Sequence, residues 1–186
     1  MIRPARENED AALRALDRAS WTTLATPAPA PSADAPFFRA GMAAADVLVA
    51  EEEGALAGYI ALGSSTPLDS NRHVLCIHGL AVAPEHRGLG LSRALVEAAA
   101  AEARRRGARK LSLRVLGENA VARALYESCG FVVEGVLREE FLLGGRYVDD
   151  VLMARTLHPQ LSTCPAAIPA LRPPPGSPTA RRWTSR

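Results

Sequence analysis

The stretch that decides the fold reads LAVAPEHRGLGLSRAL and spans residues 80–95. It joins the end of an apolar run, Val74 to Val82, to the start of an alanine-rich run, Leu91 to Arg106, which Gly107 follows. A short apolar run predicts a buried strand, and a run of helix formers closed by basic residues and a glycine predicts a helix. We therefore expect a strand, a glycine-rich turn and a helix, in that order.

The turn between these two elements is suited to binding an anion. Several backbone N–H groups at a helix N-terminus have no intrahelical partner, and the helix dipole is positive there. Gly88 and Gly90 leave room for a phosphate to approach the backbone, and Arg87 adds a fixed positive charge. A diphosphate is therefore the expected ligand of this turn.

Two common phosphate-binding motifs match the turn poorly. A Walker loop ends in Gly-Lys-Ser/Thr, but Gly90-Leu91-Ser92 contains no lysine, which argues against ATP or GTP. A dinucleotide fingerprint needs a third glycine or alanine where this chain has Arg93. A match to only two of its three small residues is weak support for that motif.

The turn resembles the pyrophosphate loop of the GNAT acetyltransferase superfamily, whose pattern is Arg/Gln-x-x-Gly-x-Gly/Ala. Arg87-Gly-Leu-Gly-Leu-Ser92 departs from this pattern only at Ser92, which is small enough to keep the loop intact. A second stretch also resembles the family: Asn119-Ala-x-Ala-x-x-Leu-Tyr126-Glu-x-x-Gly130-Phe131. The final predicted hairpin, around Gly144-Gly145, is similar to a common ending of the family, so the resemblance covers residues 2–157.

The resemblance implies an α/β fold with a central mixed, mostly antiparallel sheet, flanked by helices and splayed between the fourth and fifth strands. It also implies an N-acetyltransferase that uses acetyl-CoA as co-substrate and no metal, with direct attack by a primary amine in a ternary complex. The acceptor would be a small-molecule amine or a protein or peptide amine. The expected cofactor-binding residues are Leu80, Ala81, Val82, Arg87, Gly88, Leu89, Gly90, Leu91, Ser92, Asn119 and Tyr126.

Tyr126 is the expected general acid. Attack on a thioester expels a thiolate, which a hydroxyl hydrogen-bonded to the sulfur can protonate as it leaves. In the predicted helix from Asn119 to Cys129, Tyr126 shares a face with Ala122, while Leu125 lies on another. A core tyrosine with a satisfied hydroxyl is the alternative, and Asn119 is open to a role as helix N-cap.

His78 is the first candidate for the general base. Strict alternation along the strand places it on the same face as Leu80 and Val82. Its unperturbed pKa lies near neutral pH, so we expect it to deprotonate the acceptor amine through water. A structural histidine at the edge of the core is the alternative.

Acidic side chains on the last predicted hairpin are candidate contacts to the acceptor. They are Glu139, Glu140, Asp149 and Asp150. Because neighbouring residues of a strand face opposite sides, at most one of Asp149 and Asp150 points at the cleft.

Composition predicts one domain, residues 1–157, followed by a tail, residues 158–186. The chain has 186 residues, of which 48% are hydrophobic. The tail is rich in proline and has almost no apolar periodicity, so we expect it to be disordered. A proline-rich loop over residues 26–36 has no role that the sequence reveals. The aromatic residues beside it are interpreted as anchors of the loop to the core: Trp21, Phe37 and Phe38.

Charge argues against a nucleic-acid partner. The net charge is +2, but the tail holds four arginines and no acid, which leaves residues 1–157 at about −2. The chain has no apolar run long enough to span a membrane, its N-terminus is charged, and its three cysteines have no paired spacing. We therefore expect a cytoplasmic protein with no membrane or nucleic-acid partner, and homodimer formation stays open.

Two other functions compete with acetyl transfer. A non-catalytic acyl-CoA-binding module would keep the anion-binding turn without modifying an acceptor. A nucleic-acid-binding protein would use the arginines of the tail and would bind DNA in a salt-sensitive way.

Overall fold

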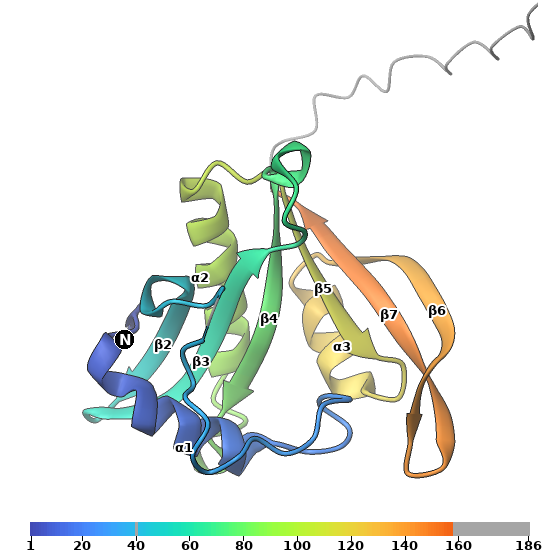
Figure 1. Ribbon diagram of the computed structural model, residues 1–186. Helices are drawn as coiled ribbons and strands as arrows, with labels where there is room; N and C mark the ends of the chain where they lie inside the picture. Colours follow the sequence, from blue (N-terminus) through green and yellow to red (C-terminus); the bar gives the residue numbers. More distant parts are fainter. Residues whose placement is uncertain (40, 158–186) are drawn as a thin grey trace, which may run out of the picture.

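Seven strands form one sheet in the order β1-β2-β3-β4-β5-β7-β6 (Figure 1). The computed structural model describes residues 1–39 and 41–157, so the predicted tail, residues 158–186, lies outside the described residues. The strands are β1 (Ile2–Pro4), β2 (Val47–Glu52), β3 (Ala55–Ser64), β4 (Val74–Val82), β5 (Lys110–Leu116), β6 (Val132–Leu143) and β7 (Arg146–Thr156). The helices are α1 (Asp10–Ser20), α2 (Leu91–Arg105) and α3 (Ala120–Ser128).

Among the strands of the described residues, one neighbouring pair, β4 with β5, is parallel, and the other pairs are antiparallel. This pairing runs from Val74 opposite Lys110 to Ile77 opposite Leu113 and then stops, although both strands continue. The ribbon shows the two strands diverging from there (Figure 1). The expected mixed, mostly antiparallel sheet, splayed between the fourth and fifth strands, is confirmed.

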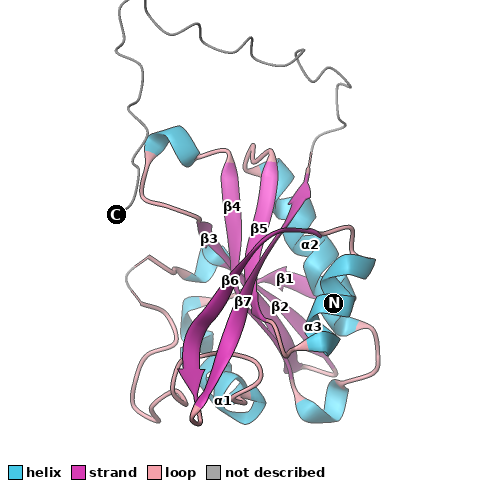
Figure 2. Cartoon of the chain, turned by 90° about the vertical axis from the view of Figure 1, so that its right-hand side faces the viewer, coloured by secondary structure: helices cyan, strands magenta, loops and turns pink. Residues whose placement is uncertain are grey.

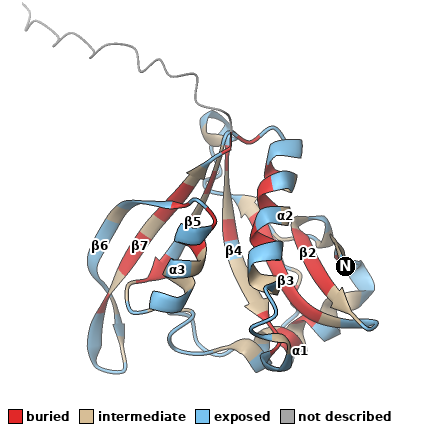
Figure 3. Cartoon of the chain, turned by 180° about the vertical axis from the view of Figure 1, so that it is seen from behind, coloured by how far each residue is buried: buried red, intermediate tan, exposed pale blue. Residues whose placement is uncertain are grey.

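The helices cover the two faces of the sheet unequally. α2 and α3 lie on one face, and α1 with the long connection to β2 lies on the other (Figures 1 and 2). Leu95, Val96 and Ala99 of α2 are fully buried against the sheet (Figure 3). Gly58 of β3 permits this close packing, because a Cβ there would lie 2.8 Å from the Ala81 carbonyl oxygen and 3.1 Å from a Leu95 methyl carbon.

The other face has a smaller core beneath α1. Leu13 and Leu16 of α1 are buried there, together with Phe37 from the proline-rich connection. The Phe37 ring meets the Tyr59 ring edge-on, with 4.9 Å between centroids, and the Trp21 indole N–H donates to the Ala28 carbonyl over 3.1 Å. These contacts anchor the connection, as the sequence predicts. None of the helices in the described part of the chain has both the length and the apolar character of a membrane span.

Candidate active site

The candidate site is the gap that opens between β4 and β5. Beyond the pair Ile77–Leu113, residues 78–82 of β4 have no β5 partner. Their other edge is paired with β3, so one edge of β4 has no strand partner here, and its Val82 carbonyl accepts from the side chains of Ser20 and Arg87 instead. The predicted backbone contacts at Leu80, Ala81 and Val82 therefore lie along a free strand edge.

The glycine-rich turn has the backbone that the sequence predicts at the N-terminus of α2. Gly88 and Gly90 have φ values of +78° and +79°, a region that L side chains rarely adopt. No heavy atom lies within 4 Å of the position that a Cβ would take at either glycine. The backbone therefore requires glycine at both positions, and the space beside them is open.

Several N–H groups of the turn are free to bind a ligand. The first intrahelical bond runs from the Ala94 N–H to the Gly90 carbonyl over 3.1 Å. Within residues 1–39 and 41–157, the backbone N–H groups from Gly88 to Arg93 have no acceptor. Arg87 is exposed, and its Nε donates to the Val82 carbonyl over 3.3 Å, which holds the guanidinium beside the turn. This arrangement suits an anion such as a pyrophosphate.

Tyr126 of α3 is buried, with 8% of its surface exposed. It belongs to the same core cluster as Ile77 and Leu113, the last paired residues before the gap. Burial raises the pKa of Tyr126 to about 12, with smaller contributions from the nearby thiols of Cys129 and Cys76. Its hydroxyl has no hydrogen-bond partner among the described residues, and it is not one of their fully buried polar atoms, so a ligand can reach it. The Tyr126 hydroxyl is thus a hydrogen-bond donor for which the described part of the chain offers no acceptor.

Asn119 is the N-cap of α3, since its side-chain oxygen accepts the Ala122 N–H over 3.0 Å. The start of α3 is therefore fixed by the side chain of the motif's first residue. Arg93 of α2 donates to the carbonyl and hydroxyl oxygens of Ser128 over 3.0 and 2.8 Å. This contact ties the turn at the start of α2 to the helix that carries Tyr126.

His78 does not lie on the face that strict alternation predicts. Ala61 pairs with Gly79 and Leu62 with Ile77, so His78 is an extra residue in a β-bulge. Ile77, Leu80 and Val82 pack toward α2, whereas the His78 ring lies over Gly63, where a Cβ would approach within 2.7 Å. The bulge therefore turns His78 to the α1 side of the sheet, at the point where the gap opens.

A cavity of about 250 Å³ lies on that side of the sheet, next to the gap. Its lining residues are Ala25, Pro27, Arg114, Val115, Leu116, Phe141 and Asp150. Asp150 is 2% exposed and accepts a hydrogen bond from Arg114, which also pairs with Glu140 over 3.4 Å. Asp149 instead lines a separate hollow, so the two aspartates face opposite sides of the sheet, as alternation predicts.

The sequence interpretation named Asp150 as a candidate contact but none of the other six residues that line this cavity: Ala25, Pro27, Arg114, Val115, Leu116 and Phe141. Arg114 shares the polar face of β5 with Lys110 and Ser112, so alternation along the strand does not set it apart. Phe141 left no signal in the sequence either. It faces the cavity because β6 carries an irregularity between Leu137 and Phe141, so that Phe141 rather than Glu139 lies opposite Val148.

Asp149 holds this irregularity of β6 in place. One of its carboxylate oxygens accepts the Glu139 N–H over 2.9 Å, and the other accepts from Arg138 over 2.6 Å. Glu139 itself has a φ of +53°, which is rare for a residue with a side chain. The clamp by Asp149 therefore stabilises an unfavourable backbone conformation that places Phe141 at the cavity and lets the exposed Glu140 pair with Arg114.

Comparisons with known sequences agree with this geometry. The model of the acetyltransferase (GNAT) family matches residues 11–131. The L-amino acid N-acyltransferase MnaT of Escherichia coli (strain K12) is 34% identical over 107 residues, which are 58% of this chain and 62% of that protein. Spermidine N(1)-acetyltransferase of Vibrio cholerae is 46% identical over 69 residues, which are 37% of this chain and 40% of that protein. The chain thus spans less than two thirds of each of these relatives.

Solved structures share the fold over most of their length. The protein smu.2055 from Streptococcus mutans UA159 has a TM-score of 0.74 at 28% identity, over 85% of this chain and 99% of that chain. The acetyltransferase yncA from Salmonella typhimurium, solved with its cofactor acetyl-CoA, has a TM-score of 0.73 at 26% identity, over 88% and 96% of the two chains. With a family match over more than half of its residues, this chain belongs to the acetyltransferase (GNAT) family.

Proposed function

We propose that this chain transfers the acetyl group of acetyl-CoA to a primary amine, by direct attack in a ternary complex. The observation that carries the proposal is Tyr126: its side chain is buried in the core cluster that reaches the gap, and its hydroxyl, which is not fully buried, has no partner among the described residues. A ligand in the gap can therefore reach this hydroxyl and complete its hydrogen bond. A module that only binds acyl-CoA needs the turn at α2 but not this hydroxyl.

The turn fits the pyrophosphate of acetyl-CoA. The free N–H groups from Gly88 to Arg93 and the open space at the two glycines would receive it, and Arg87 would add a charge. Leu89 and Leu91 border the same space, and Ser92 is half-buried at the first turn of α2. The free edge of Leu80 to Val82 would bind the amide groups of the pantetheine arm. The acetyl-CoA in the yncA structure supports this proposal.

Acetyl-CoA, when bound, supplies an acetyl group activated as a thioester. Tyr126 then donates its proton to the departing sulfur, which would otherwise leave as a thiolate. Because burial holds the pKa of Tyr126 at about 12, the proton is present at neutral pH. Correct placement of two bound reactants supplies the larger share of the rate, and proton transfer adds a factor of about 10² to 10⁴.

His78 is the proposed base. Its Nε2 lies 3.2 Å from the Ser64 carbonyl oxygen, which only accepts hydrogen bonds, so a neutral ring must carry its proton on Nε2. Nδ1 is then left with a lone pair that can take the proton of the acceptor ammonium through water. His78 is exposed, so water has access to it.

The test is release of free coenzyme A over a panel of amines and peptides, measured together with acetyl-CoA binding by calorimetry. Acetyl transfer predicts binding and a new thiol with at least one acceptor. Binding without any thiol release across the panel would favour the acyl-CoA-binding module. Salt-sensitive DNA binding that is lost when the chain ends at Leu157 would favour the nucleic-acid alternative.

A further inference from the structure

We propose that the cavity formed by Arg114, Phe141 and Asp150 binds the acceptor, and that this acceptor is a small primary amine with an apolar body and a single positive charge. The inference rests on the proposed function and names the substrate class of the same site. It is carried by the size, the walls and the charge of the cavity.

The size and walls of the cavity limit the acceptor. Its volume of about 250 Å³ lies just below the range of about 300 to 1,000 Å³ usual for drug-sized ligands. The apolar part of its lining comes from Ala25 and Pro27 of the α1–β2 connection, Val115 and Leu116 of β5, and Phe141 of β6. A small hydrocarbon body fills such a space, whereas a second charged group would lose its hydration there.

The charged side chains in and beside the cavity have a net charge of −1, which a ligand with one positive charge would balance. Asp150 lines the cavity and Glu140 is exposed beside it; each carries one negative charge, and the Arg114 guanidinium that pairs with both carries one positive charge. Only the Oδ2 atom of Asp150 accepts from Arg114, and Oδ1 has no partner among the described residues. An ammonium group beside Oδ1 would bring the net charge of Arg114, Glu140 and Asp150 to zero, whereas a carboxylate would make it more negative.

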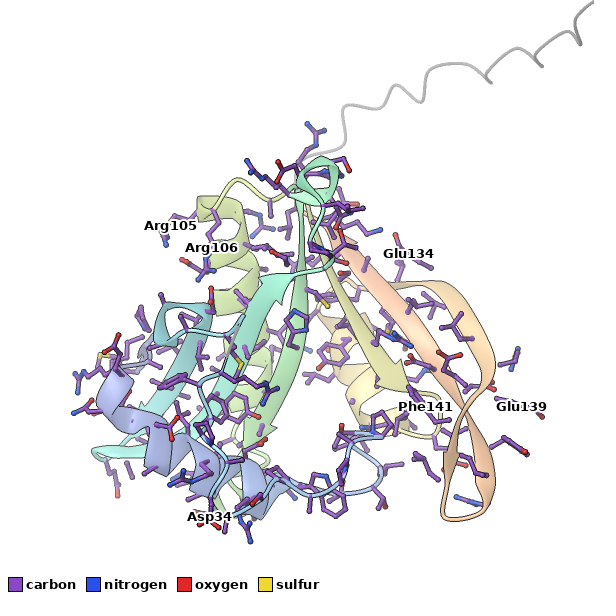
Figure 4. All side chains as sticks on the ribbon, in the orientation of Figure 1. Asp34, Arg105, Arg106, Glu134, Glu139 and Phe141 are labelled. Atoms are coloured by element: carbon purple, nitrogen blue, oxygen red, sulfur yellow. The ribbon has the colours of Figure 1, made fainter. Side chains whose placement is uncertain are left out.

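The cavity adjoins the reaction site. Arg114 to Leu116 form the part of β5 that has separated from β4, and Leu116 pairs directly with Asp150. Figure 4 shows Phe141 at the end of β6 near the α1–β2 connection. An ammonium at Asp150 therefore lies beside the gap that we assign to the acetyl group, on the side that also carries His78.

Matched amines test the substrate class. We would compare 2-phenylethylamine with phenylalanine and isoamylamine with leucine, which differ only by a carboxylate, and add spermidine and an alanine-initiated peptide. Coenzyme A release gives kcat/KM, and calorimetry of the protein without acetyl-CoA gives direct amine binding. We expect each plain amine to exceed its amino acid, spermidine and the peptide by about tenfold or more in kcat/KM.

Two variants test the cavity itself. Asp150→Asn removes the charge that meets the ammonium and should weaken 2-phenylethylamine binding by about tenfold, with acetyl-CoA affinity unchanged. Because this change also weakens the pairing of Arg114, a second variant, Ala25→Leu, fills the cavity from an exposed loop and leaves the core intact. It should raise KM for 2-phenylethylamine far more than for ethylamine. Glu134→Gln, at the far end of β6 where Glu134 pairs with Lys110, is the control and should change neither (Figure 4).

The outcomes separate this inference from the proposed function. If phenylalanine, spermidine or the peptide turns over faster than the plain amines, acetyl transfer stands and the cavity proposal is wrong. If nothing releases coenzyme A but 2-phenylethylamine binds in a way that Ala25→Leu abolishes, the cavity proposal stands and acetyl transfer fails. Absence of both turnover and binding overturns the cavity proposal as well.

Discussion

The two sides of the gap between β4 and β5 are built from different parts of the chain. The surface proposed for acetyl-CoA comes from one continuous stretch, β4 through the start of α2, together with α3. The cavity proposed for the acceptor combines residues of the α1–β2 connection, β5, β6 and β7. The first surface offers mainly backbone N–H groups, and the second mainly side chains. Substitutions should therefore affect the two surfaces separately.

The largest effect is expected at Tyr126, which lies between the two surfaces. Tyr126→Phe removes only the hydroxyl, so we expect kcat to fall by about 10²-fold or more while KM for acetyl-CoA stays the same. Steady-state kinetics with a good acceptor measures both. Tyr147→Phe, at a tyrosine that is 66% exposed, is the control and should leave kcat unchanged. Full turnover in Tyr126→Phe would remove this residue as the acid.

A glycine pair tests whether the acetyl-CoA side depends on backbone conformation. Gly90 and Gly107 flank α2, have φ values of +79° and +81°, and have no neighbour within 4 Å of a Cβ. Alanine at either position should cost about 1 to 2 kcal/mol of stability. Only Gly90→Ala should also raise KM for acetyl-CoA, by about tenfold, since the turn would have to regain its strained form to bind. An equal rise in Gly107→Ala would show that general destabilisation is responsible.

Asp149→Asn tests the side chains of the acceptor side. The asparagine keeps an oxygen for the Glu139 N–H but loses the charge that pairs with Arg138, so the irregularity of β6 should loosen. We expect KM for the acceptor to rise about fivefold, which corresponds to a loss of about 1 kcal/mol. KM for acetyl-CoA should not move. A change confined to acetyl-CoA would contradict the division into two surfaces.

A smaller effect is expected from the charge of Arg87. An exposed ion pair contributes up to about 1 kcal/mol, so loss of the Arg87 charge beside the pyrophosphate in Arg87→Gln should raise KM for acetyl-CoA by up to about fivefold. The difference should shrink as salt is raised, because screening weakens exposed charges. A loss larger than that of Gly90→Ala would mean that charge, rather than backbone geometry, dominates this side.

The last prediction is the absence of a change with pH. An unperturbed tyrosine loses its proton near pH 10, but burial raises the pKa of Tyr126 to about 12. The acid form therefore persists as the pH rises from 9 to 10.5. If the Tyr126 hydroxyl lost its proton in this range, kcat would fall, and the fall would be absent in Tyr126→Phe. We expect the pH profile of kcat to show no such fall. Such a fall would indicate that burial of the side chain does not raise the pKa of Tyr126.

The elements near the gap were predictable because their signals are local. The bounds of β4 match the predicted run from Val74 to Val82, and α2 starts at Leu91 as predicted. Asn119 and Gly130 flank α3 because a cap side chain and a glycine with positive φ act on neighbouring residues. The family resemblance rests on the same two stretches.

The acceptor side was harder to predict because it depends on register. Alternation along β4 failed at His78, where one extra residue turns the side chain to the opposite face. In a similar way, the irregularity of β6 puts Phe141 opposite Val148, where regular pairing would put Glu139. Both shifts arise from pairing with another strand, which a single sequence does not display.

The sequence by itself determined the order of the strands and helices along the chain and the glycine-rich turn at residues 87–92, because each depends on interactions within a few neighbouring residues. The roles of this turn in anion binding and of Tyr126 as the acid stay predictions, and the second rests on the family resemblance. Only the tertiary structure decided that β4 carries a bulge, that Arg114, Glu140 and Asp150 form one charged set, and that the α1–β2 connection closes a cavity over them. These features require segments far apart in the chain to meet, and the register of their pairing is set by the whole sheet.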